Sequence, residues 1–327
     1  MKHISILVPE GDCSLSNIEG THQILTEVNA AFVREGKPRV FDIQLVGLHK
    51  NSAVKKGFFS IYPDVLIEDL DKTDLVIIPA IQEKDMKRAI ELNRGFIPWL
   101  VKQHSQGAAL ASLCIGSFLL AATGLLNGKK CSTHWDAANN FRDMFPDVVL
   151  VPDKIITDEK GIYSSGGAYS ALNLILYLIE KFAGRDKAIL CSKVFQIEID
   201  RNSQSGFMIF NPQKGHEDEA VKKAQEFIEK NFQEKITIAQ LASMVALSRR
   251  NLERRFKKAT RNTTVEYIQR VKIEAAKMSL EKTRENVNEV MYSVGYTDTK
   301  AFRTTFKKIT GLSPVQYRGK YQREVEA

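Results

Sequence analysis

A cysteine at a sharp turn is the first residue whose type and setting could do chemistry. Cys114 stands between residues 108–113, an apolar run that predicts a strand, and residues 115–122, which predict a helix. At such an elbow the sulfur lies near helix N–H groups, which can lower a thiol pKa and activate a nucleophile. Catalysis also needs a base or an anion-stabilising partner beside the sulfur. Packing, pocket-lining and oxidisable roles for Cys114 therefore stay open.

A second group of residues could read DNA, and it belongs to an internal repeat. Residues 238–247 match residues 287–296 at an offset of 49, and one extra residue in the second turn then makes the offset 50. Each copy predicts a short helix, a tight turn through Ala246 or Gly295, and a second amphipathic helix. This pattern predicts a helix-turn-helix unit, whose second helix projects polar side chains into a major groove.

The second helices are predicted at residues 249–259 and 299–309. Their apolar stripes are buried, and the polar positions, Arg255 among them, are left for solvent or DNA. Arg can bind guanine through two hydrogen bonds, Asn can do so for adenine, and Lys mainly contacts phosphates. We expect the DNA-binding residues to be Ser248, Arg249, Arg250, Asn251, Arg254, Asp298, Thr299, Lys300 and Arg303.

A long apolar-striped helix, residues 264–281, is predicted between the two copies. About 18 residues at 1.5 Å each span roughly 27 Å. One turn of DNA is slightly longer, about 34 Å, so the two copies could reach successive major-groove segments with modest bending. This spacing predicts double-stranded DNA as the partner.

The charge of the chain agrees with that partner because it is unevenly distributed. The net charge is +8, but from Glu219 to the end there are 23 Lys and Arg against 13 Asp and Glu, which leaves −2 for the rest. A basic tail predicts a polyanion, although a solvated basic surface is the alternative. The apolar content of 43% excludes a wholly disordered chain, and no apolar run is long enough to span a membrane. The four separated cysteines predict no metal site, and a reducing cytoplasm is the expected location.

The elements that must position Cys114 alternate between strand and helix. Strands are predicted at residues 4–8, 41–48, 74–79 and 108–113, and helices at 17–34, 96–104 and 168–182. This alternation predicts an α/β fold with a mostly parallel sheet between two helical layers. We therefore expect a domain at residues 1–200, a turn-rich linker at 201–217, and an all-α tandem helix-turn-helix domain at 218–321.

The tail resembles the DNA-binding domain of the AraC/XylS family of transcriptional regulators. The motifs that carry the resemblance are Leu-Ser-Arg-Arg-Asn-Leu-Glu-Arg-Arg-Phe at residues 247–256 and the Val-Gly-Tyr…Phe…Gly-Leu-Ser-Pro pattern at 294–314. They cover about 100 residues together with the repeat. The resemblance implies sequence-specific binding to DNA.

The first 200 residues resemble the ThiJ/PfpI class, which is related to class I glutamine amidotransferases and has a flavodoxin-like sheet with a cysteine at the elbow. Supporting motifs are residues 111–117, the Gly-Leu-Leu-Asn-Gly…Thr-His-Trp string at 124–135, and Ser-Ser-Gly-Gly at 164–167. In an open α/β sheet ligands bind at the carboxyl ends of the strands. The ligand-binding residues are then expected to be Gly11, Asp12, Cys114, Ile115, His134, Trp135, Gly166 and Gly167.

The resemblance does not imply an enzyme. Enzymatic relatives commonly have a histidine after the cysteine, where this chain has Ile115. Other relatives place a glutamate after the first strand, where this chain has Ser16, with Glu19 a turn away. His134 could approach the sulfur, but Thr-His-Trp also occurs in the regulators. We therefore expect no catalytic residue, no cofactor, and a degenerate elbow that lines a sensor pocket.

Three hypotheses follow from these patterns. The preferred one is a transcriptional regulator that is controlled by a small-molecule effector at the Cys114 pocket, forms a homodimer and acts on RNA polymerase. The second is a cysteine-dependent hydrolase or lyase fused to a DNA-binding tail. The third is an architectural DNA-binding protein whose first domain only dimerises. The sequence does not identify the effector, the operator or the direction of regulation.

Overall fold

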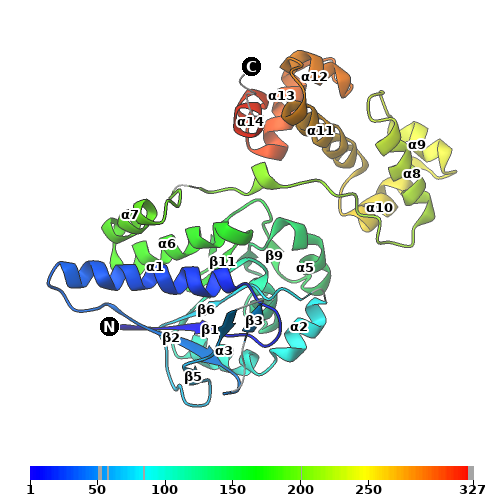
Figure 1. The fold of residues 1–327 in the computed structure, drawn as a ribbon. Helices are drawn as coiled ribbons and strands as arrows, with labels where there is room; N and C mark the ends of the chain where they lie inside the picture. Colours follow the sequence, from blue (N-terminus) through cyan, green and yellow to red (C-terminus); the bar gives the residue numbers. More distant parts are fainter. Residues whose placement is uncertain (51–53, 57–58, 84, 200, 323–327) are drawn as a thin grey trace. The chain divides into compact units, whose positions relative to one another are not determined.

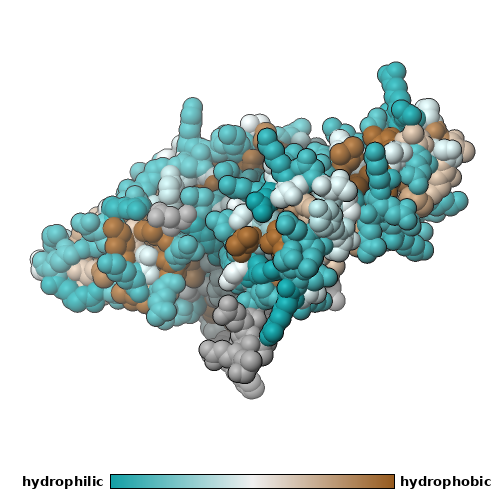
Figure 2. Space-filling model, turned by 90° about the horizontal axis from the view of Figure 1, so that it is seen from above, coloured by the Kyte–Doolittle hydropathy of each residue, from teal (hydrophilic) through white to brown (hydrophobic). Residues whose placement is uncertain are grey.

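The computed structural model describes residues 1–322 except 51–53, 57–58, 84 and 200. The chain divides into two compact units, Met1–Gln204 and Ser205–Ala327. Among the described residues no helix is long and apolar enough to cross a membrane. On the face that Figure 2 draws, hydrophilic residues predominate over both units and hydrophobic residues form small separate groups.

The first unit is built on a seven-stranded sheet with the order β10-β11-β7-β6-β1-β2-β5. All neighbouring strands are parallel except β10 and β11. Short apolar runs form the central strands because both of their faces are covered. The strands are β1 Lys2–Leu7, β2 Phe41–Gly47, β5 Val65–Leu66, β6 Leu75–Ile78, β7 Ala109–Ser112, β10 Ile156–Asp158 and β11 Ile162–Ser165, with small pairs of β3 Val54–Lys56 and β4 Phe59–Ile61, and of β8 Lys130–Cys131 and β9 Val149–Leu150.

Helices cover both faces of this sheet, as Figure 1 shows. One face packs against α1 (Leu15–Arg34), α6 (Ala171–Ala183) and α7 (Arg185–Val194). The other packs against α2 (Met86–Leu92), α3 (Phe96–Ser105), α4 (Ser117–Ala122) and α5 (Ala138–Met144). In β6, Leu75 and Ile77 point to the first layer while Val76 and Ile78 point to the second. The predicted parallel-sheet, three-layer fold is confirmed.

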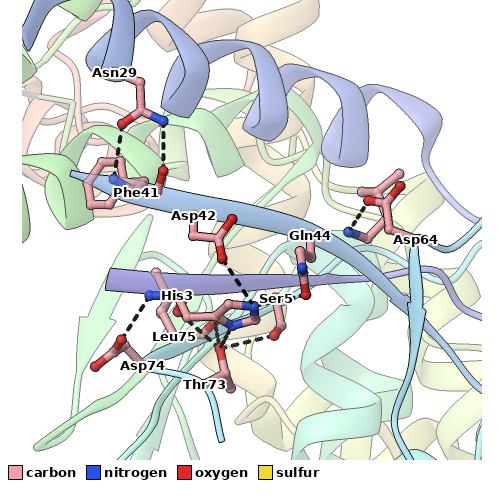
Figure 3. Close-up of polar contacts among 11 residues, drawn as sticks. His3, Ser5, Asn29, Phe41, Asp42, Gln44, Asp64, Thr73, Asp74 and Leu75 are labelled. Atoms are coloured by element: carbon pink, nitrogen blue, oxygen red, sulfur yellow. Dashed lines mark hydrogen bonds and ion pairs between the residues drawn. The ribbon is translucent and has the colours of Figure 1, made fainter. Parts of the chain in front are cut away.

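A polar network holds the amino ends of the central strands together (Figure 3). The His3 ring bonds through Nδ1 to the Thr73 hydroxyl at 2.9 Å and through Nε2 to Gln44 at 3.0 Å. The backbone N–H of His3 donates to the Asp74 carboxylate at 2.8 Å. Since the strands are parallel, this network lies at the opposite end of the sheet from the elbow at Cys114. It fixes the strand positions without entering the site.

The regular elements of the second unit are all helices among the described residues, and an irregular stretch, residues 208–218, precedes the first long one. Its helices are α8 Glu219–Lys230, α9 Ile238–Met244, α10 Arg249–Thr260, α11 Thr264–Lys282, α12 Val287–Ser293, α13 Thr299–Thr310 and α14 Pro314–Tyr321. Two hydrophobic cores share α11: one lies among α8, α9 and α10, the other among α12, α13 and α14. The predicted all-α tandem domain is confirmed, and each helix-turn-helix copy has its own core.

The residues expected to form a linker, 201–217, are divided between the units. Gln204 bonds to residues of the first unit. Gly206, Met208 and Phe210 bond to residues of the second. Most of this turn-rich stretch therefore runs along a folded unit instead of forming a free tether.

Candidate functional site

The elbow has the tight geometry that its sequence predicts. Cys114 follows β7 with φ +55°, in the left-handed region that side chains rarely adopt, and begins a single 3-10 turn, η1 (Cys114–Gly116). A Cβ on Gly116 would lie 2.5 Å from the carbonyl oxygens of both Ile78 and Pro79. Glycine is required there because the turn packs directly on the end of β6. The neighbouring strands thus hold the sulfur at the carboxyl edge of the sheet.

The surroundings of the Cys114 thiol disfavour its ionised form. Its side chain is only 6% exposed, and burial raises the pKa of the thiol above its ordinary value. The backbone N–H groups of Ala168 and Ile115 act in the opposite direction, but more weakly than burial. The group is therefore a neutral thiol near pH 7, whereas nucleophilic attack needs the thiolate.

A cavity of about 570 Å³ opens beside this thiol. Each wall comes from a loop at the carboxyl end of a strand or from the helix or turn that follows it. The start of α1, after β1, supplies Ser14, Ser16 and Asn17, and the loop after β6 supplies Ala80, Gln82 and Glu83. This volume is in the range of small-molecule binding sites.

The remaining walls surround Cys114 and Ile115. One comes from the turn η2 (Trp135–Ala137) with His134 and Asp136, and another from the turn η3 (Ala168–Ser170) with Ala168 and Tyr169. Tyr169 is 72% exposed, so its ring stands at the cavity rim. Met86 and Asn140 complete the lining with Ala137.

Carboxylates dominate the charge of the lining. Glu83 and Asp136 line the cavity, and among the described residues no lysine or arginine does. Burial lowers the pKa of His134, so its ring is neutral near pH 7. The ring's Nδ1 accepts a hydrogen bond from the Asp136 backbone at 3.2 Å, which places the proton on Nε2.

Three of the expected ligand-binding residues line this cavity: Cys114, Ile115 and His134. The other five lie around it without lining it. Gly11 and Asp12 adjoin Glu83, whose carboxylate accepts from the Asp12 N–H at 3.3 Å. The Trp135 ring lies 5.4 Å from the His134 ring.

Gly166 and Gly167 have a different neighbour from the one expected. A Cβ on Gly166 would lie 2.6 Å from the amide nitrogen of Gln204, and the Gly167 N–H donates to the Gln204 side-chain oxygen at 3.1 Å. Both glycines receive this side chain instead of lining the cavity.

Sequence reasoning missed the acidic side of the pocket. Glu83 and Gln82 follow the predicted strand at residues 74–79, so the carboxyl-end rule could have indicated them. Ser16, at the position expected for an enzyme's glutamate, does line the cavity, and its hydroxyl bonds to that of Ser14 at 3.0 Å. Glu19 is not among the lining residues.

The DNA-reading candidates lie on two matching helices. Each helix follows a turn with positive φ, at Ala246 (+52°) or Gly295 (+75°). Ser248 and Asp298 cap α10 and α13 by accepting backbone N–H groups at 3.3 and 2.7 Å. The expected residues are exposed, except for half-buried Asn251, and they lie on the first two turns of the two helices and at their caps: Ser248, Arg249, Arg250, Asn251, Arg254, Asp298, Thr299, Lys300 and Arg303.

One basic residue that the sequence pattern leaves for solvent or DNA has a structural role. Arg255 donates from Nε and Nη2 to the two carboxylate oxygens of Asp218, at 2.8 and 2.6 Å. Asp218 also caps α8, so this pair fastens α10 to α8. The expectation that Arg255 is free for DNA is therefore wrong. Arg254 donates to Asn251 at 3.0 Å, which orients two candidate readers on one face.

Comparisons with known proteins agree with this division. Residues 25–181 match the DJ-1/PfpI family, and residues 241–320 match a helix-turn-helix domain family. The HTH-type transcriptional regulator GbdR of Pseudomonas aeruginosa is 28% identical over 78% of this chain and 68% of its own length. The regulator CdhR of the same species is 26% identical over 79% of this chain and 76% of its own length.

A partial sequence match and a solved structure agree with a DJ-1/PfpI-type fold for the first unit. An isonitrile hydratase of Pseudomonas putida is 28% identical over 39% of this chain and 54% of its own length. A crystal structure of an AraC family transcriptional regulator from Pseudomonas putida covers 60% of this chain and all of its own, with 17% identity and a TM-score of 0.51. The relatives that span both units are transcriptional regulators, and this supports the expectation that the chain is a regulator and not an enzyme. The chain therefore combines a DJ-1/PfpI-family domain with an AraC-type helix-turn-helix domain, and the relatives that match most of it are HTH-type transcriptional regulators.

Proposed function

We propose that this regulator binds a small-molecule effector in the Cys114 pocket and changes its binding to DNA in response. The observation that carries the proposal is a formed cavity of about 570 Å³ around a buried, unactivated thiol, in a chain that also holds two helix-turn-helix copies. The sensor function is assigned to residues 1–200 and DNA binding to residues 218–321. The site therefore holds a cysteine at the elbow whose surroundings favour the neutral thiol.

DNA binding is assigned to the exposed side chains of α10 and α13. Arg249, Arg250 and Arg254 of α10 and Arg303 of α13 are the candidate base readers, with Lys300 as a phosphate contact. The shared helix α11 has 19 residues and so a length of about 28 Å. This length favours contact with two successive major-groove segments of one duplex.

The charge of the pocket favours a positively charged effector. Glu83 and Asp136 would attract a cation, and the neutral His134 would not oppose it. The exposed Tyr169 ring at the rim adds a surface on which a cation can rest. We assign the effector to small organic cations, such as amines and quaternary ammonium compounds.

The other partners follow from the regulator function. A homodimer would bind DNA through two tails and so more tightly than a single chain. RNA polymerase is the partner through which DNA binding would alter transcription. A cytoplasmic location, where thiols are kept reduced, agrees with four cysteines that are all buried.

A thermal-shift screen of the full chain tests the effector proposal. A ligand that binds the native state raises the melting temperature. Cationic metabolites should raise it in the wild type and lose this effect in Glu83→Gln and Asp136→Asn. An effect limited to anionic compounds would overturn the charge assignment. A Cys114→Ala variant should keep ligand-dependent DNA binding, and that result would rule out the hydrolase or lyase hypothesis.

A further inference from the structure

We propose that Gln204 fastens the walls of the effector pocket to the DNA-binding unit, so that the pocket and the tail respond to each other through this one side chain. The inference rests on the proposed function and adds the device that joins its two halves. Gln204 touches no effector in this scheme. It is a positioning residue.

Gln204 is an anchor buried in the first unit. Its side chain is 1% exposed, and its amide nitrogen donates to the carbonyl oxygens of Thr133 at 2.9 Å, Pro152 at 2.7 Å and Lys154 at 3.2 Å. Its side-chain oxygen accepts from the Gly167 N–H at 3.1 Å. A buried amide with this many partners is held firmly, because releasing it leaves several polar groups unpaired.

Two of those partners adjoin the pocket walls. Gly167 immediately precedes Ala168, which lines the cavity and whose N–H faces the Cys114 sulfur. Thr133 precedes His134, another lining residue, and its hydroxyl donates to the Cys114 carbonyl at 3.3 Å. Gln204 thus joins Gly167 and Thr133, the residues directly before the two walls. Gly166 has no Cβ, and a Cβ there would clash with the Gln204 amide.

The next residues along the chain are held by the second unit. Ser205 begins the 3-10 turn η4 (Ser205–Phe207), and its Cβ lies 3.7 Å from the position of a Cβ on Gly311, which ends α13. The Gly206 carbonyl accepts from the Tyr321 hydroxyl at 2.8 Å, and the Met208 carbonyl accepts from Lys277 at 2.7 Å.

Gln204 is therefore held by residues of the first unit, and Ser205 and Gly206, which follow it directly, are held by residues of the second. An effector that favours one arrangement of the pocket walls must also favour one position of Gln204, and so bias the residues beside α13. Linkage is reciprocal, so DNA bound to the tail must change the pocket to the same extent. This reciprocity allows a test without a known effector.

The test is hydrogen exchange of the full chain, with and without a DNA duplex selected from random sequences by the wild type. In the wild type, DNA should protect α10 and α13 and also change exchange in peptides covering residues 132–137 and 166–170. We expect about a fivefold change or more in the pocket peptides, the lower end of typical coupling between sites.

Two variants remove the coupling in different ways. Gln204→Ala removes the anchor, with Ser203→Ala as the control, since Ser203 is the exposed neighbour whose hydroxyl donates to Asp153. A Gly-Ser-Gly insertion between Gln204 and Ser205 keeps both sets of anchors and adds slack, so it tests the idea even if Gln204→Ala disturbs folding. Both should keep DNA protection of α10 and α13 and lose the change at residues 166–170, while Ser203→Ala keeps both.

Each contrary outcome has a distinct meaning. Protection of α10 and α13 without any change at residues 166–170 in the wild type overturns this inference and leaves the proposed function standing. A full pocket response in the insertion variant also overturns it. Absence of DNA protection in the wild-type tail overturns the proposed function and this inference together.

Discussion

The two helix-turn-helix copies share a scaffold but present different surfaces. Both second helices have 12 residues, and both bury the same positions: Leu252 matches Phe302, and Phe256 matches Phe306. The outward residues have diverged, because Asn251 matches Ala301, Glu253 matches Arg303, and Arg254 matches Thr304. The two copies thus keep the same buried positions while the residue types on their outward faces differ. We therefore expect the two copies to recognise different base sequences.

The largest effect should come from the shared cores. Phe256→Ala and Phe306→Ala should each destabilise the tail by about 3–5 kcal/mol, since both rings are fully buried. Hydrogen exchange of tail peptides in denaturant measures the loss. Fluorescence of the two tryptophans, Trp99 and Trp135, both in the first unit, is the control for that unit. A large loss in only one copy would contradict the shared scaffold.

Substitutions at the turns of the two copies, at Gly295 and Ala246, should change the free energy of unfolding in opposite directions. A Cβ on Gly295 would lie 2.0 Å from the Gln233 carbonyl oxygen and 2.6 Å from Lys272 Nζ, so Gly295→Ala should cost about 1–3 kcal/mol or more. Ala246 already holds φ +52° in the other copy, and Ala246→Gly should stabilise or be neutral, within about 1 kcal/mol. Thermal unfolding of the tail compares them. Equal effects would show that the second turn is not more crowded than the first.

Replacement of the exposed arginines should show which base positions each helix-turn-helix copy recognises. Arg254→Ala and Arg303→Ala should each weaken binding to the selected duplex by about 1–3 kcal/mol if the side chain contacts a base through two hydrogen bonds. The relaxed base position should differ between the two variants. Titrations on single-base variants of the duplex measure this. An equal loss on random DNA would assign the arginine to phosphate contacts instead.

The smallest expected effect is a loss of stability at low pH from the ion pair of Asp218 and Arg255. The hydrogen bonds from Arg255 hold the pKa of Asp218 below its ordinary value. The ion pair thus contributes stability that is present above the unfolded pKa, near 3.9, and is lost as the pH falls through the lower folded pKa. Thr305 stands at the matching position of the second copy, so this contribution belongs to the first alone.

Asp218→Asn should therefore flatten the acid dependence of tail melting by less than about 1 kcal/mol, because the pair is partly exposed. Calorimetry of the wild type and the variant between about pH 3 and pH 6 spans the ordinary aspartate pKa. If the melting temperatures of the two proteins changed equally with pH across this range, that result would contradict a stabilising role for the pair.

The fold and the DNA-binding helices could largely be predicted from the sequence. Helical periodicity is local, and the repeat located α10 and α13 to within one residue. The elbow at Cys114 followed from a strand, a turn and a helix in succession. Local pattern also placed three residues on the pocket wall, because the carboxyl ends of parallel strands meet at one edge.

What the sequence determined by itself is thus the set of elements, the repeated scaffold and the edge of the sheet that carries the pocket. Only the tertiary structure decided that Arg255 binds Asp218, that Glu83 and Asp136 set the charge of the pocket, and that Gly166 and Gly167 receive Gln204. It also decided that the Cys114 thiol is buried, which raises its pKa. The physical reason is that hydrogen-bond partners, desolvation and cavity walls depend on residues far apart in the chain, which periodicity and turn chemistry cannot bring together.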